Sequence, residues 1–323
     1  MGITIKQRER RKGYLGASDI PVALGFGRLD ESGMPYKSQR ALWAEKTQEM
    51  EQDSEPDFGL PAALGTGLEN TILELACQEH GVEIRRNVFR VHPVHKMLAC
   101  HLDAQWQSDK GIAYEAKWTS QRGRYGDPGS DQVPDEVAVQ CLSQMGIAGL
   151  ERVFVPVLFG GRFPQFEIFV IERDDKVVAQ IIDSAAAWWE KHVIGGEQPP
   201  EGGARDIEVF KRLKRVPDAM AQIPLEPFEA YYDIKQQKAD IDKQYKAAQG
   251  EVVALIGTNS GAFVGDGPDS HPFMFTYKQQ KGADRVDLKG LRAKHPEIYS
   301  EFATENRYPV ARVSKNPNHQ GDK

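Results

Sequence analysis

Apolar residues in the first two-thirds of the chain recur with two different periods, one typical of helices and one typical of strands. Recurrence every three or four positions predicts helices over residues 18–25, 38–46, 64–81, 135–148 and 174–192. Alternation with a period of two predicts strands over residues 82–91, 97–103, 111–118, 152–159 and 165–171. Ser18 and Ser38 stand where the first two helices begin, and we expect both to act as N-caps.

This order of elements predicts an α/β fold in which a central mixed sheet is flanked by helices. The Gly- and Pro-rich stretch at 195–200 predicts a domain boundary, which gives domains 1–200 and 201–323. In the second domain, apolar residues from Tyr231 to Leu255 follow an a/d heptad pattern. This pattern predicts a helical arm or a short coiled coil, followed by a hairpin over 263–278, a short helix over 286–296 and a last strand over 308–313.

Composition narrows the class of protein. With 323 residues, of which 40% are hydrophobic and 27% charged, the chain is long enough to bury a large core. It contains no run of eighteen apolar residues and no apolar signal segment at its start, so we expect a cytoplasmic protein. Cys77, Cys100 and Cys141 are too few and too scattered for a disulfide scaffold or a zinc site, which favours free buried thiols.

The net charge of −6 does not exclude nucleic-acid binding, because the basic residues are clustered. One cluster lies near the N-terminus and includes Arg10, Arg11 and Lys12, and a second lies at 211–215. Either cluster is also compatible with a solvated surface.

The strongest chemical signal is Asp103 on one predicted strand, followed by Glu115-Ala116-Lys117 on the next. Strand alternation places Glu115 and Lys117 on the same face, with Ala116 turned the other way. If the two strands pair as a hairpin, Asp103 meets that face. Carboxylate oxygens suit Mg²⁺ or Mn²⁺, and a neighbouring lysine orients a water or stabilises charge on a phosphate, so the set suits phosphodiester hydrolysis.

A plainer interpretation of Glu115 and Lys117 is a surface ion pair on an edge strand. An acidic residue two positions before a lysine occurs four times in the chain, and the other three copies fall in expected turns or helices. Only the copy at Glu115 lies in a strand next to a second acid. By itself the tripeptide therefore favours the surface pair.

Further motifs favour a functional site over a surface ion pair. In chain order they are Gly16-Ala-Ser-Asp19, Gly65-x-Gly-x-Glu69, Asp103, Glu115-x-Lys117 and Gln140-x-x-x-Gln144-Met145. Over about residues 10–200, this series resembles the YqaJ-type viral recombinase family, which is akin to phage lambda exonuclease and belongs to the PD-(D/E)xK nucleases. The resemblance implies a restriction-endonuclease-like core, to which the region after residue 200 adds a helical and small α+β extension.

The resemblance also implies roles for individual residues. Asp103 and Glu115 would bind two Mg²⁺ ions, for which Mn²⁺ substitutes, with help from the Ala116 backbone carbonyl and from Glu69. Lys117 would contact the attacking water or the scissile phosphate, and Gln140 matches a glutamine near the active site. Arg11 and Ser18 match residues that hold a DNA 5′-phosphate. Gln144 lies where the spacing of the family varies and is assigned no role.

By this resemblance we expect a Mg²⁺-dependent exonuclease of phage or prophage recombination that acts in the cytoplasm of a bacterial host. It would digest duplex ends 5′ to 3′ and leave 3′ single strands for a single-strand annealing protein. A homo-oligomer such as a trimer is implied for lambda-type relatives. Two alternatives remain open, an endonuclease with the same metal site and a non-catalytic DNA-binding or assembly protein.

Overall fold

The computed structural model describes residues 10–30, 33–49, 59–200, 202–203, 206–216, 219–267, 271–281, 286–303 and 313. The chain divides into two compact units, residues 1–215 and 216–323, which are described separately below. The first unit extends past the expected boundary at residue 200, because residues 206–215 contact the helix that begins at Gln39.

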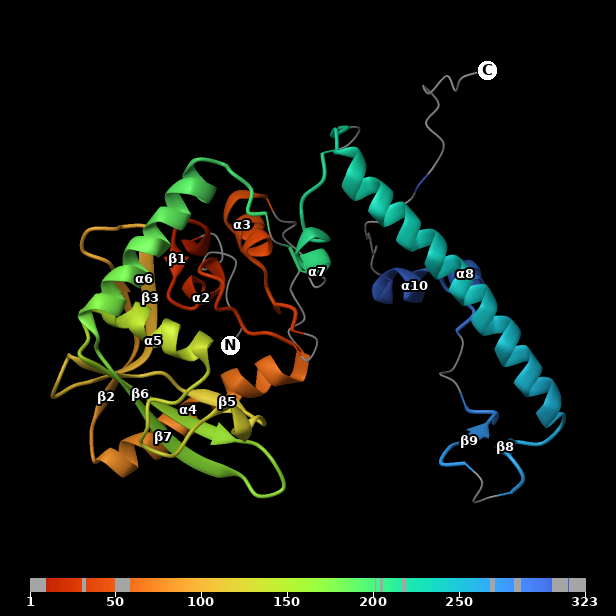
Figure 1. Cartoon of the computed structure of the whole chain (residues 1–323), viewed down its shortest axis with the longest axis horizontal. Coiled ribbons are helices and arrows are strands. Elements are labelled where there is room, and N and C mark those ends of the chain that lie inside the picture. The colour runs from red at the N-terminus through yellow and green to blue at the C-terminus, as the bar shows by residue number, and fades with distance from the viewer. Residues whose placement is uncertain are drawn as a thin grey trace. The chain divides into compact units, whose positions relative to one another are not determined.

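The first unit is built on a seven-stranded mixed sheet (Figure 1). Its strands are β1 (Leu15–Gly16), β2 (Ile84–Val91), β3 (Leu98–Trp106), β4 (Ile112–Tyr114), β5 (Lys117–Thr119), β6 (Arg152–Phe159) and β7 (Gln165–Glu172). β3 pairs with β2 and β4 in antiparallel fashion and with β1 in parallel, while β6 runs parallel to β4 and β5 and antiparallel to β7. The predicted α/β fold with a mixed sheet is therefore confirmed.

Helices cover both faces of this sheet. The helices of the first unit are α2 (Ile20–Ala23), α3 (Gln39–Thr47), α4 (Gly59–His80), α5 (Asp135–Ala148), α6 (Asp175–Trp188) and α7 (Asp206–Phe210). α6 continues as a π-helical segment over Trp189–Ile194. α5 has the predicted bounds and ends at Gly149, whose left-handed backbone (φ of 68°) favours glycine.

The core lies between the sheet and two stacked helices on one side, with a smaller cluster on the other. α5 packs on the sheet and α6 packs on α5. A Cβ at Gly146 of α5 would stand 2.5 Å from Ile182 of α6, so glycine allows the two helices to approach closely. On the opposite face, Leu73 and Ala76 of α4 pack against Ala104 and Tyr114. Glu115, which follows β4, and Lys117, which begins β5, contact α5, whereas Ala116 between them packs in the α4 cluster, as strand alternation predicted.

Two local predictions need correction. Ser38 caps α3 as predicted, with its hydroxyl accepting a hydrogen bond from the Ala41 N–H. Ser18 does not cap α2, whose N-cap is Asp19, and the Ser18 hydroxyl instead accepts a hydrogen bond from Arg11. The strand expected over 111–118 is interrupted at Glu115 and Ala116, because the Ala116 N–H is directed to the Asp103 carboxylate.

The second unit contains the predicted helical arm as one helix, α8 (Leu225–Ile256), which extends beyond the heptad pattern at both ends. The predicted hairpin is formed by β8 (Gly261–Phe263) and β9 (Met274–Thr276), and the short helices α9 (Leu288–Lys294) and α10 (Pro296–Phe302) follow. Residues 308–312 of the expected last strand lie outside the described residues. No helix in the described ranges is long and apolar enough to cross a membrane.

Candidate active site

The interruption between β4 and β5 brings the sequence-predicted carboxylates together. Antiparallel pairing of β3 with β4 sets Ala104 opposite Tyr114, so Asp103 lies opposite Glu115 at the next position. The Asp103 carboxylate accepts a hydrogen bond from the Ala116 N–H at 2.9 Å. β5 then continues the parallel register of β4 on β6, so the interruption does not displace Lys117 from the sheet. The predicted meeting of Asp103 with the Glu115 segment is confirmed.

Glu115 is held by three side-chain donors. Its Oε1 atom accepts from Lys117 Nζ at 2.6 Å and from Gln140 Nε2 at 2.7 Å. Its Oε2 atom accepts from Gln144 Nε2 at 2.6 Å. Glu115 is buried, with 4% of its surface exposed. These contacts contradict the interpretation of Glu115 and Lys117 as a solvated surface pair, because two helix α5 side chains cover the carboxylate.

Negative charge is concentrated at this point. Burial and the neighbouring Glu115 carboxylate hold the pKa of Asp103 well above its usual range. Burial by itself would lower the pKa of Lys117, but the Glu115 and Asp103 carboxylates more than offset it, so the pKa of Lys117 is raised and the lysine stays cationic. A second cation at this site would relieve the remaining repulsion between the two carboxylates.

Glu69 of α4 interacts electrostatically with the carboxylate of Glu115. Its side chain is half-buried on α4, and burial together with the Glu115 charge raises its pKa. The three carboxylates of Glu69, Asp103 and Glu115 nevertheless do not converge. Within the described part of the chain, no group of three or more His, Cys, Asp or Glu side chains lies close enough together to hold a metal ion. The convergent oxygen donors are therefore those of Asp103 and Glu115.

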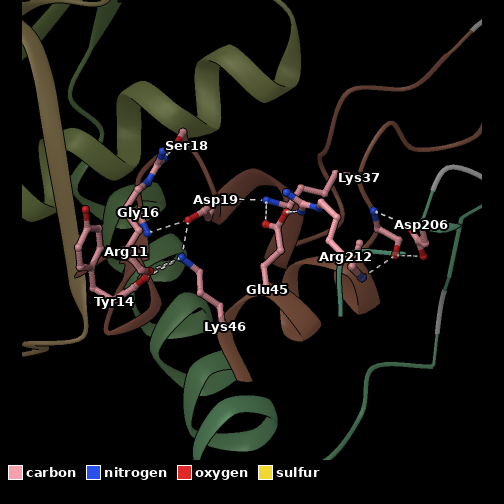
Figure 2. Close-up of polar contacts among 12 residues, drawn as sticks. Arg11, Tyr14, Gly16, Ser18, Asp19, Lys37, Glu45, Lys46, Asp206 and Arg212 are labelled. Carbon is pink, nitrogen blue, oxygen red and sulfur yellow. Dashed lines mark hydrogen bonds and ion pairs between the residues drawn. The ribbon is translucent and has the colours of Figure 1, made fainter. Parts of the chain in front are cut away.

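Arg11 and Ser18 lie beside this centre because β1 pairs with the beginning of β3. The Leu15 N–H donates to the Met97 carbonyl at 2.7 Å, which fixes the adjacent turn that carries Ser18. Arg11 Nη2 donates to Ser18 Oγ at 3.4 Å, and Figure 2 shows the guanidinium reaching the hydroxyl across this turn. The pairing of a guanidinium with a hydroxyl suits an anionic phosphate.

The Arg11 and Ser18 side chains share one cavity with the Asp103 and Glu115 carboxylates. It has a volume of about 230 Å³, and its lining includes Arg11, Ser18, Asp103, Glu115 and Gln140. A cationic side chain and two carboxylates thus open into the same space. This juxtaposition joins residues that are about a hundred positions apart in the chain.

Two supporting residues had not been assigned roles from the sequence. Gln144 is fully buried and holds Glu115, although family spacing singled out only Gln140. The helical spacing of four between Gln140 and Gln144 was the signal that could have found it, because residues four apart share a helix face. Lys46 of α3 bonds the segment that carries Arg11, and no local pattern marks it.

Sequence comparisons show which known proteins this chain is similar to. Residues 7–151 match the YqaJ-like viral recombinase domain. The chain is 25% identical over 313 residues to the uncharacterized protein YqaJ of Bacillus subtilis (strain 168). The aligned region covers 93% of this chain and 90% of that protein.

Two solved structures are also similar in part. A crystal structure of an alkaline exonuclease (LHK-Exo) from Laribacter hongkongensis is 18% identical and has a TM-score of 0.44, covering 59% of this chain and 94% of that one. A phage related exonuclease from Haemophilus somnus 129PT is 11% identical with a TM-score of 0.39, covering 57% and 96%.

Proposed function

Because residues 7–151 match the YqaJ-like viral recombinase domain, we propose that the protein is a metal-dependent DNA exonuclease that recognises phosphorylated 5′ ends. The observation that carries this proposal is the shared cavity, in which Arg11 and Ser18 face the same space as Asp103 and Glu115. A nuclease that held a terminal phosphate in the first pair would present a nearby phosphodiester to the second.

The oxygen donors at Asp103 and Glu115 fit a hard divalent cation. Burial and the neighbouring Glu115 carboxylate raise the pKa of Asp103, and Mg²⁺ or Mn²⁺ would neutralise the negative charge of the pair. Asp103, Glu115 and the Ala116 carbonyl would hold the metal, two ions in all, with Glu69 supplying further negative charge from α4. When bound, such ions polarise the phosphate and lower the pKa of a bound water.

The protein's own side chains orient this centre. Gln140 and Gln144 hold the two oxygens of Glu115 from α5, which keeps its carboxylate directed at the cavity. The Lys117 ammonium lies 2.6 Å from Glu115 and 3.0 Å from Gln140, where it would hold the attacking water or stabilise charge that develops on the phosphate. Preorganised donors of this kind avoid rearrangement during the reaction.

Arg11 and Ser18 would determine which ends are cut. A terminal phosphate carries more negative charge than an internal one, so a fixed guanidinium and hydroxyl favour a chain end. Digestion would proceed 5′ to 3′ on duplex DNA and leave 3′ single strands for a single-strand annealing protein. Assembly into a homo-oligomer around DNA, as expected from the family resemblance, belongs to the same proposal.

The test compares three substrates in Mg²⁺: a linear duplex with 5′-phosphates, the same duplex with 5′-hydroxyls, and a covalently closed circle. We expect the phosphorylated duplex to be digested fastest, the circle to stay intact, and all activity to be lost in EDTA and restored by Mg²⁺ or Mn²⁺. The Glu115→Ala variant should be inactive.

Other outcomes would point elsewhere. Cutting of the circle would support the endonuclease alternative, and equal rates on both linear duplexes would contradict the role of Arg11 and Ser18. Absence of activity with either metal would favour the non-catalytic alternative.

A further inference from the structure

Lys46 of α3 is a buried lysine that bonds the segment carrying Arg11 and Ser18. Its side chain is 5% exposed, and its ammonium donates to the Arg11 carbonyl, the Tyr14 carbonyl and the Asp19 carboxylate, each at 2.8 Å. An ammonium has three hydrogens, so this set uses all of its donors. Figure 2 shows Lys46 between Asp19 and the backbone near Tyr14.

Asp19 links Lys46 to the turn that displays Ser18. Its Oδ2 atom accepts from the Gly16 N–H at 3.3 Å, which closes the turn around Ser18. Burial by itself would raise the pKa of Asp19, but the ammonium groups of Lys37 and Lys46 hold it well below its usual range, so the carboxylate stays ionised. One buried ion pair therefore joins both pieces of backbone from which the phosphate-binding side chains project.

A series of ion pairs connects Asp19 to residues outside the cavity lining. Lys37 lies 3.7 Å from Asp19 and 2.5 Å from Glu45, and Glu45 accepts from Arg212 at 3.0 Å. Arg212 follows α7, outside the matched residues 7–151. The alternating chain of acids and bases thus anchors the turn to α3 and to the end of the first unit.

Lys46 is not placed to bind a phosphate itself. Its donors are fully used, and it is not among the residues that line the cavity. Its effect on a ligand must therefore pass through Arg11 and Ser18. Without it, two backbone carbonyls and a buried carboxylate would lose their shared donor, and the spacing between the guanidinium and the hydroxyl would no longer be held.

We propose that Lys46 is a positioning residue that gives the Arg11 and Ser18 pocket its selectivity for a terminal phosphate, with Asp19 and Lys37 as its supports. This inference rests on the proposed function. It makes selectivity for the 5′ end depend on a buried ion pair that never touches DNA. A merely structural lysine would instead change the rates on all substrates together.

The experiment uses the full-length Lys46→Met variant and two linear duplexes that differ only in a 5′-phosphate or 5′-hydroxyl, in Mg²⁺. The ratio of kcat/KM on the two ends is the readout. We expect this ratio to fall by about 10- to 100-fold, mainly through a higher KM on phosphorylated ends, because small displacements of a binding group have effects of this order. Lys214→Met is the matched control, since Lys214 is 65% exposed and pairs with the exposed Glu49, and its ratio should equal that of the wild type.

Lys37→Met is the second variant, in case Lys46→Met does not fold as judged by circular dichroism and thermal melting. Lys37 is 31% exposed and bonds no backbone carbonyl of the Arg11 segment, so a smaller fall in the same direction is expected. A folded Lys46→Met with the wild-type ratio, or with equal losses on both ends, would overturn the inference. If Lys46→Met is unfolded, an unchanged ratio in Lys37→Met would do so.

The wild type and the Arg11→Met variant test the proposed 5′-phosphate pocket separately from the role of Lys46. If the wild type itself does not discriminate between the two ends, the phosphate pocket is wrong and the inference falls with it. If the wild type discriminates and Arg11→Met does not, the pocket stands and the Lys46 variants decide the inference alone.

Discussion

Replacing Gln144 by leucine should lower activity while changing the free energy of unfolding little. Gln144 lies on α5 with its side chain fully buried, and its Nε2 atom donates to Glu115 at 2.6 Å. Its Oε1 atom is buried without a hydrogen-bond partner among the described residues. The amide therefore stabilises the carboxylate at one end and carries an unsatisfied acceptor at the other. Leucine has a similar volume and keeps neither feature.

The two ends of the amide have opposite effects on the free energy of unfolding. Loss of a hydrogen bond to a charged acceptor costs about 1.5–3 kcal/mol, whereas removal of a buried unsatisfied carbonyl recovers about 1–3 kcal/mol. The net change should therefore lie between a gain of about 1.5 kcal/mol and a loss of about 2 kcal/mol. Activity has no such offset, because Glu115 loses the donor that orients its Oε2 atom. Changes to groups that orient metal ligands lower activity by about 10- to 100-fold.

Urea unfolding and initial rates of duplex digestion in Mg²⁺ measure the two effects. Ser143→Ala is the matched control, because Ser143 is equally buried on α5 but its hydroxyl donates to the Val139 carbonyl of its own helix. The control should keep wild-type activity. Wild-type activity in Gln144→Leu, or a loss of stability above about 3 kcal/mol, would refute the assignment of Gln144 to the active site.

Two further predictions concern the charged groups. Lys117→Met should lower kcat by about 10²- to 10⁴-fold in single-turnover digestion while DNA affinity changes little, because in the proposed function the ammonium acts at the reacting phosphate; an equal loss of affinity would contradict this role. Asp19→Asn should destabilise the fold at pH 7 by about 3 kcal/mol, because Lys46 and Lys37 lose their buried partner. The pKa of Asp19 is depressed in the folded state, so its stabilisation is present above about pH 4 and is lost as the pH falls below that value. Urea titrations should show the gap between wild type and Asp19→Asn narrowing there, and a gap independent of pH would argue against an ionised Asp19.

Local patterns in the sequence determined most of the fold. The helix over 135–148 and the strand over 152–159 have the predicted bounds, because periodicity, a proline at the start and a glycine at the end act within a few residues. The same reasoning placed Glu115 and Lys117 on one face and Ala116 on the other. The family resemblance also implied roles for Arg11, Ser18 and Gln140, all of which line the cavity with the carboxylates.

The tertiary structure decided how these residues are held. Ser18 is a residue type that favours the N-cap position, but Asp19 occupies that position. Lys46, 27 residues away, donates a hydrogen bond to the Asp19 carboxylate. Glu115 accepts from Gln144, 29 positions later, and the strand is interrupted where Ala116 meets Asp103. No local pattern marks Lys46, and helical spacing places Gln144 beside Gln140 without showing that it bonds Glu115. Burial makes each charge depend on distant groups of the chain, because a buried carboxylate or ammonium is tolerated only where packing supplies its counterpart.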